Sequence, residues 1–113
     1  MCANKLYFIT EKYPNSWETM SFFYVAVGRD LTEIHKLCDL DIPTNYNLEV
    51  IKEVNGSPGL LLDVRICYAC YNIEIFKISK EIKKYAEIIT TFNIYRSTKN
   101  MEALRNILRE LDI

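Results

Sequence analysis

The sequence predicts an α+β fold, a two-layer sandwich in which about three helices cover a mainly antiparallel sheet of four to five strands. Two observations indicate this fold: β-prone runs joined by turn residues, and separate segments whose apolar residues recur at helical spacing. The 113 residues correspond to a single domain, residues 1–113. Half of them are hydrophobic and 26% are charged, so the chain has enough apolar material to form a core.

The first strands are expected to form a hairpin. Residues 5–12 contain the apolar run LYFI, and residues 17–27 are rich in aromatic and β-branched side chains. The segment YPNS between them has the composition of a turn.

A short helix is predicted after this hairpin. Asp30 precedes Glu33 by three residues, which is the spacing of a capping box. One apolar helix face follows, formed by Leu31, Ile34, Leu37 and Cys38. We expect the helix to stop near Asp39, before a polar loop that contains proline.

A second hairpin is predicted over residues 48–71. Residues 48–54 alternate, with Leu48, Val50, Lys52 and Val54 expected on one face. The strongest turn signal of the chain, NGSPG, follows at 55–59. Residues 60–71 form the longest predicted strand, half-buried, with Asp63 and Arg65 on its polar face.

The C-terminal part predicts helix, strand and helix. Ile75, Ile78, Ile82, Tyr85 and Ile89 fall at helical spacing, and Ser79 is the expected N-cap of a helix that ends near Ile89. Residues 90–95 have strand propensity. A last helix, capped by Ser97 or Asn100, has an apolar face expected to pack against the sheet: Met101, Leu104, Ile107, Leu108 and Leu111.

The composition of the N-terminal segment and the lengths of the apolar runs predict a cytoplasmic protein. The first residues lack the apolar core of a secretory signal, and no apolar run reaches the roughly 18 residues that span a bilayer. The four cysteines are therefore expected to be thiols.

Two paired spacings, His35-x-x-Cys38 and Cys67-x-x-Cys70, raise the hypothesis of a zinc or thiol protein. His35 and Cys38 share a predicted helix face, but residues three apart on a strand point to opposite faces. The alternative is that the cysteines are small buried apolar side chains. We expect no metal and no cofactor.

The sequence also predicts that the protein is not an enzyme. Three glycines cannot assemble a P-loop or a dinucleotide-binding fingerprint. Asp63 and the pair Glu74-x-x-Lys77 lack the spacing that places acid and lysine on one strand face, as metal nucleases require. His35 is the only histidine available as a base.

Charge is uneven along the chain. Residues 1–56 carry five Lys and Arg against eight Asp and Glu, a net charge of −3, and residues 57–113 carry +2. Lys77, Lys80 and Lys84 form a basic stripe at helical spacing, which leaves nucleic-acid binding as an alternative function.

Acidic residues near the first helix and the following strand predict a partner-binding surface. The predicted site is formed by Asp39, Asp41, Tyr46, Glu49 and Glu53. Acidic groups would steer a basic partner protein, and the tyrosine would anchor it. In size and composition the chain is similar to bacterial immunity proteins and to small viral or phage inhibitors. The predicted function is therefore a small inhibitor, such as an immunity protein that occludes the active site of a basic toxin.

Overall fold

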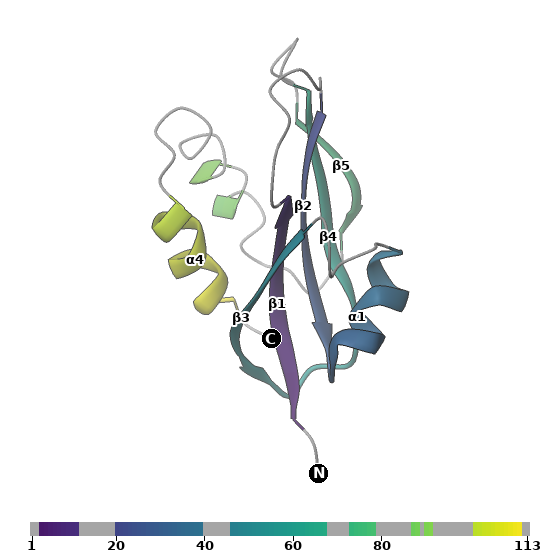
Figure 1. Ribbon diagram of the computed structural model, residues 1–113. Coiled ribbons are helices and arrows are strands. Elements are labelled where there is room, and N and C mark those ends of the chain that lie inside the picture. The colour runs from purple at the N-terminus through teal and green to yellow at the C-terminus, as the bar shows by residue number, and fades with distance from the viewer. Residues whose placement is uncertain are drawn as a thin grey trace. The chain divides into compact units, whose positions relative to one another are not determined.

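The computed structural model describes residues 3–11, 20–39, 46–67, 73–78, 87–88, 90–91 and 101–111. The chain divides into two compact units, residues 1–79 and 80–113. That both belong to one domain stays a prediction. The described elements of the first unit, shown in Figure 1, are β1 (Asn4–Glu11), β2 (Met20–Gly28), α1 (Leu31–Cys38), β3 (Tyr46–Val54), β4 (Gly59–Cys67) and β5 (Ile73–Ile78).

The strands form one antiparallel sheet with the order β3-β1-β2-β4-β5. The predicted first hairpin is confirmed, because β1 pairs with β2 and places Leu6 opposite Val27 and Ile9 opposite Tyr24. The α+β character and the antiparallel sheet are confirmed as well.

The predicted second hairpin is wrong. β3 pairs with β1, and β4 pairs with β2, so the two strands flank the first hairpin on opposite sides. The physical reason is that β1 and β2 are apolar on both faces: residues 6–9 and 23–27 are all buried. Such strands need neighbours on both sides. The connection from β3 to β4 passes the end of the hairpin, where Asn4 Nδ2 donates a hydrogen bond to the Gly56 carbonyl oxygen at 2.7 Å.

A β-bulge interrupts β3. Tyr7 lies opposite Val50, whereas Leu6 lies opposite Lys52, so Ile51 is the extra residue. Val50 therefore shares the sheet face of Tyr7, and Lys52 lies on the other face with Leu6. The predicted single alternation along this strand is wrong, because the bulge reverses it.

The centre of β4 is buried on both faces, which corrects the prediction of a half-buried strand. Leu62 and Val64 are fully buried on one face, and Asp63 on the other face is only 8% exposed. The cause is position, since β4 lies between β2 and β5. The strand ends at Cys67, and the remainder of the predicted strand lies outside the described residues.

The predicted caps of α1 are confirmed. Asp30 Oδ1 accepts a hydrogen bond from the Glu33 backbone N–H at 3.0 Å, and the Glu33 carboxylate accepts one from the Arg29 N–H. At the other end, Asp39 adopts the left-handed region with a φ of 52°, and its N–H donates to the His35 carbonyl at 2.9 Å.

Helix α1 packs on one face of the sheet, mainly over β2 and β4. Close approach depends on Gly28, where a Cβ atom would lie 2.7 Å from Ile34 Cδ1. The side chains buried together on this face are Tyr7, Ile9, Tyr24, Ala26, Ile34 and Cys38, with Leu37, Tyr46, Leu48 and Leu60 packed around them.

The second unit contains the predicted last helix as α4 (Met101–Arg109). Leu104, Leu108 and Leu111 are buried, and an ion pair of 3.0 Å joins Arg109 to Glu102. The residues proposed to cap this helix lie outside the described ranges, and its packing against the sheet stays a prediction.

Two C-terminal predictions are corrected in part. Thr90 and Thr91 are helical and not extended, and Ile75 and Ile78 belong to β5 and not to a helix. A spacing of three fits a helix, whereas in β5 a register shift opposite Asp63 and Val64 pairs Ile75 with Val64 and Ile78 with Leu62. The other residues of the predicted helix over 79–89 are not described, apart from Glu87 and Ile88, which are helical.

The pairing of β3 with β1 predicts the effect of Asn4→Ala. Loss of the hydrogen bond to Gly56 should lower the free energy of unfolding by about 1 kcal/mol. Chemical denaturation measures the change, and Asn55→Ala, an exposed position in the same connection, is the matched control. Equal destabilisation by the two variants would contradict the role of Asn4.

Candidate protein-binding surface

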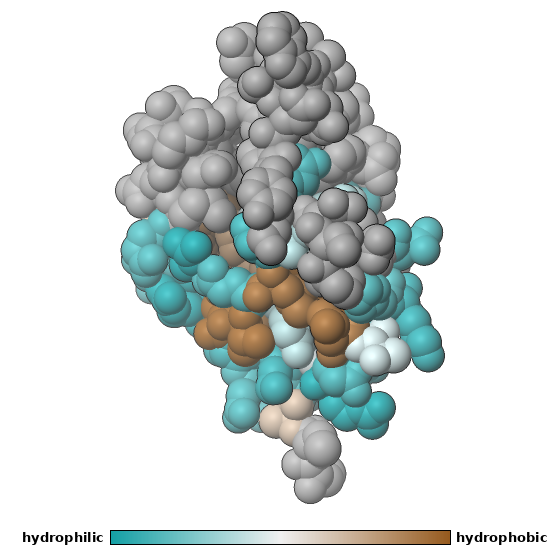
Figure 2. Space-filling view, in the orientation of Figure 1, coloured by the Kyte–Doolittle hydropathy of each residue, from teal (hydrophilic) through white to brown (hydrophobic). Residues whose placement is uncertain are grey.

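The helix-bearing face of the sheet leaves apolar side chains at the surface beside β3. Tyr46, Leu48 and Val50 point to this face from β3, and Leu37 packs against the same cluster from α1. We call these four residues the α1–β3 surface. Val50 is 50% exposed, although Tyr7 opposite it is buried. In Figure 2, hydrophobic side chains gather over β3 and β1, beside α1.

The first turn of α1 also exposes an apolar side chain. Leu31 is 42% exposed, and it lies next to Asp30 and near Glu33 in the same turn. Burial raises the pKa of the Tyr7 hydroxyl, and the carboxylates of Asp30 and Glu33 raise it further. These two acids therefore lie near Tyr7, at the edge of the α1–β3 surface, and the phenol remains neutral.

Tyr46 anchors the other end of the surface. Its ring meets the ring of Tyr24 edge to face, with centroids 6.4 Å apart and planes at 73°. Tyr46 is only half-buried, so part of the ring remains accessible. Cys38, at the C-terminal end of α1, belongs to the same core cluster, and Asp39 after it is exposed.

The structure separates the other predicted site residues. Glu49 lies opposite Phe8 and therefore faces the side of the sheet away from α1. Glu53 is exposed on the α1 side, but it lies at the far end of β3, opposite Lys5. Asp41 lies outside the described residues. The structure thus places Tyr46 in the α1–β3 surface, Asp39 at the end of α1, and the two glutamates on opposite faces of β3.

Sequence reasoning missed two acidic residues of this surface. Asp30 and Glu33 were interpreted only as helix caps, which they are, but their position near Tyr7 also makes them part of the acidic edge. Leu31 lies between these two acids. The sequence predicts a buried position for every apolar residue of this helix face, whereas Leu31 is 42% exposed.

The thiol of Cys38 is poorly suited to metal binding or nucleophilic chemistry. The side chain is 8% exposed, and burial raises its pKa to about 12, with a further increase from the Asp63 carboxylate. Zinc ligands and nucleophiles require the thiolate. Cys67 ends β4, where only its backbone is described, and Cys70 lies outside the described residues. In the described ranges, no three His, Cys, Asp or Glu side chains are grouped as a metal site.

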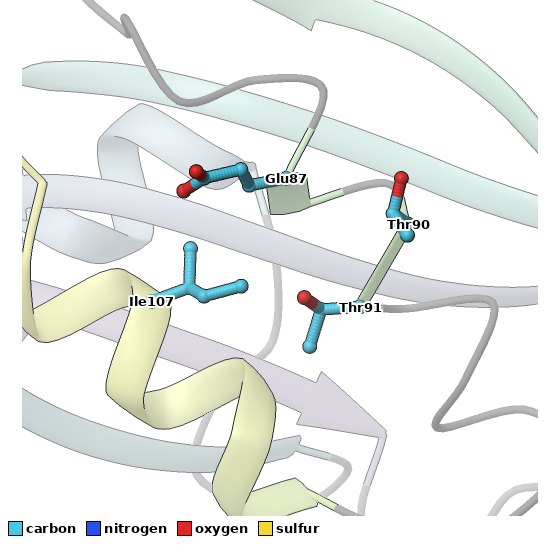
Figure 3. A pocket seen from close by; sticks show the side chains of 4 residues that line it. All are labelled: Glu87, Thr90, Thr91 and Ile107. Carbon is cyan, nitrogen blue, oxygen red and sulfur yellow. The ribbon is translucent and has the colours of Figure 1, made fainter.

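The second unit contains an open cavity of about 260 Å³. Figure 3 shows Glu87, Thr90, Thr91 and Ile107 around it, with the Ile107 side chain extending from α4 toward the space between Glu87 and Thr91. A carboxylate and two hydroxyl groups could hydrogen-bond a small polar molecule.

The basic stripe of the nucleic-acid alternative is largely outside the described residues. Lys77 lies in β5, whose backbone alone is described, and Lys80 and Lys84 are not described. That alternative stays a prediction.

Comparisons add no relative to this picture. No protein-family model, no curated protein and no solved structure matches the chain. Among the described helices, none is long and apolar enough to cross a membrane.

The raised pKa of Cys38 predicts an alkaline loss of stability. The folded state holds the thiol proton up to a pH of about 12, whereas the unfolded value is 9.0. The contribution is therefore complete below pH 9 and is lost as the pH rises toward 12, at roughly 1.4 kcal/mol per pH unit. Urea unfolding of the protein and of Cys38→Ala between pH 8 and pH 11 measures the difference in slope. Parallel pH profiles would show that Cys38 titrates normally.

Proposed function

We propose that this chain is a non-enzymatic inhibitor that binds a basic partner protein through the α1–β3 surface in the cytoplasm, as an immunity protein covers the active site of a toxin. The observation that supports the proposal is the exposure of Val50 on the helix-bearing face of the sheet, where Asp30 and Glu33 lie near Tyr7. Apolar side chains left exposed next to a strand with a buried centre are typical of an interaction surface.

The residue chemistry of the surface favours a protein partner. A half-buried tyrosine such as Tyr46 presents both an apolar ring and a hydroxyl group, and such side chains are common anchors in protein interfaces. Asp30 and Glu33 place carboxylates near Tyr7, which lies opposite Val50. Charge of one sign around an apolar centre attracts a partner of the opposite sign and raises the rate of association.

Asp39 supports the proposal because its backbone conformation and its charge at the end of α1 are both unfavourable for folding. A non-glycine residue with a φ of 52° is strained, and a carboxylate at a helix C-terminus interacts unfavourably with the helix dipole. Glycine at this position would serve the fold better. An exposed residue that folding disfavours is expected where function requires it.

The variant Asp39→Gly should therefore separate stability from binding. We expect the free energy of unfolding to increase by about 0.5–1 kcal/mol, because glycine relieves both penalties. Association with the partner should become slower, since one steering charge is lost. Thermal unfolding and stopped-flow association measure the two effects. Asp39→Asn tolerates the same backbone and removes only the charge, so unchanged association in both variants would exclude Asp39 from the interface.

The test of the function itself is capture of partners from the native host. Bait protein, Val50→Asp and Thr32→Asp would be compared, with bound protein and nucleic acid both measured. Thr32 is also exposed but belongs to α1 outside the α1–β3 surface, so it is the matched control. We expect a basic protein to bind the unchanged chain and Thr32→Asp but not Val50→Asp, and the purified partner to lose its activity when bound.

Two outcomes would contradict the proposal. Recovery of RNA or DNA without a protein would favour the alternative based on Lys77, Lys80 and Lys84. Capture of the same protein by Val50→Asp would show that another face of the chain carries the function.

A further inference from the structure

Strand β3 is an edge strand of the sheet that the structure describes. Among the described strands it pairs with β1 alone, at the end of the sheet order. Eight of its nine residues are half-buried or exposed, Val54 being the exception, whereas the centre of β1 beside it is buried. The outer backbone N–H and C=O groups of such a strand can pair with another strand.

The bulge makes the charges of this edge self-complementary. Without it, Glu49 and Lys52 would lie three positions apart and point to opposite faces. With Ile51 as the extra residue, Glu49 lies opposite Phe8 and Lys52 opposite Leu6, on the same face of the sheet. The two charges therefore flank the bulge: Glu49 precedes Val50, and Lys52 follows Ile51.

We propose that the β3 edge binds a second copy of this chain, forming an antiparallel β3–β3 pair whose two-fold axis passes through the bulge. In this register Glu49 of each copy lies opposite Lys52 of the other, so the dimer contains two Glu49–Lys52 pairs. Opposite charges directly across an antiparallel pair stabilise it, and like charges destabilise it. The charges thus select one register among those that the backbone allows.

The same register also covers Val50, which is half exposed in one copy. Val50 then lies opposite Ile51 of the second copy, next to the axis. A two-fold axis perpendicular to the sheet keeps the helix-bearing faces of both copies on the same side. The two α1–β3 surfaces then adjoin each other. The inference itself does not rest on the proposed function, because it uses the edge, the bulge and two charges on the opposite face.

Charges and bulges on edge strands often prevent pairing, so their arrangement decides the outcome. A row of like charges would repel a second copy in every register. Here the signs alternate about the bulge and attract a second copy in one antiparallel register. A two-stranded contact of this length belongs to small interfaces, so we expect a dimer that depends on concentration.

The experiment is a charge swap followed by sedimentation equilibrium from about 5 µM to 1 mM, a range suited to weak dimers. The unchanged chain should dimerise within this range. Glu49→Lys and Lys52→Glu should each weaken the dimer at least tenfold, because each places two like-charged pairs across the axis. The double variant should restore the dimer. An equimolar mixture of the two single variants should also dimerise, since each copy then carries the charge that the other lacks.

Glu53→Lys is the matched control, because Glu53 points to the other face and lies opposite Leu48 of the second copy in this register. It should leave the dissociation constant within about threefold, as expected for a charge without a charged partner across the pair. Circular dichroism confirms that each variant folds. A monomer at 1 mM, or a dimer that neither single variant weakens, would overturn the proposal. Neither result bears on partner association measured with Asp39→Gly and Asp39→Asn, because Asp39 lies at the end of α1 and outside β3.

Discussion

The first hairpin is apolar on both faces, and the rest of the sheet depends on this constraint. Residues 6–9 of β1 and 23–27 of β2 are buried without the alternation that a surface strand shows. Two such strands cannot form an edge without exposing large apolar side chains to water. The chain therefore adds β3 on one side and β4 on the other, and the short connection between them crosses the end of the hairpin near Asn4.

Short sequence patterns predicted the elements that are formed by interactions between residues close together in the chain. The caps of α1 are set by side chains within four residues of each other, as Asp30 and Glu33 show. The first hairpin and the last helix also follow from short patterns. The pairing of β3 and β4 does not, because a turn such as NGSPG fixes where the chain reverses and not which strand becomes the neighbour. Only the burial demanded by β1 and β2 determines that, and it acts between distant segments.

The candidate site was predictable to the same extent. Tyr46 packs against the core cluster under α1 from the start of β3, whereas Asp39 follows the last residue of the helix. A regular strand would put Glu49 and Glu53 on the same face, because they are four residues apart. The extra residue Ile51 moves Glu53 to the opposite face. A bulge leaves no composition signal here, since Ile51 has the strand propensity of its neighbours.

The bulge also divides the chemistry of β3 between two faces. Up to Val50 the side chains on the α1 side are apolar, and they continue the surface that Tyr46 anchors. Glu49 and Lys52 lie together on the opposite side, where their charges do not interrupt that surface. A regular strand would have placed Lys52 beside Val50, with its cation within the acidic edge near Tyr7. One inserted residue thus keeps a positive charge away from a surface proposed to attract a basic partner, and it gives the same strand a self-complementary edge.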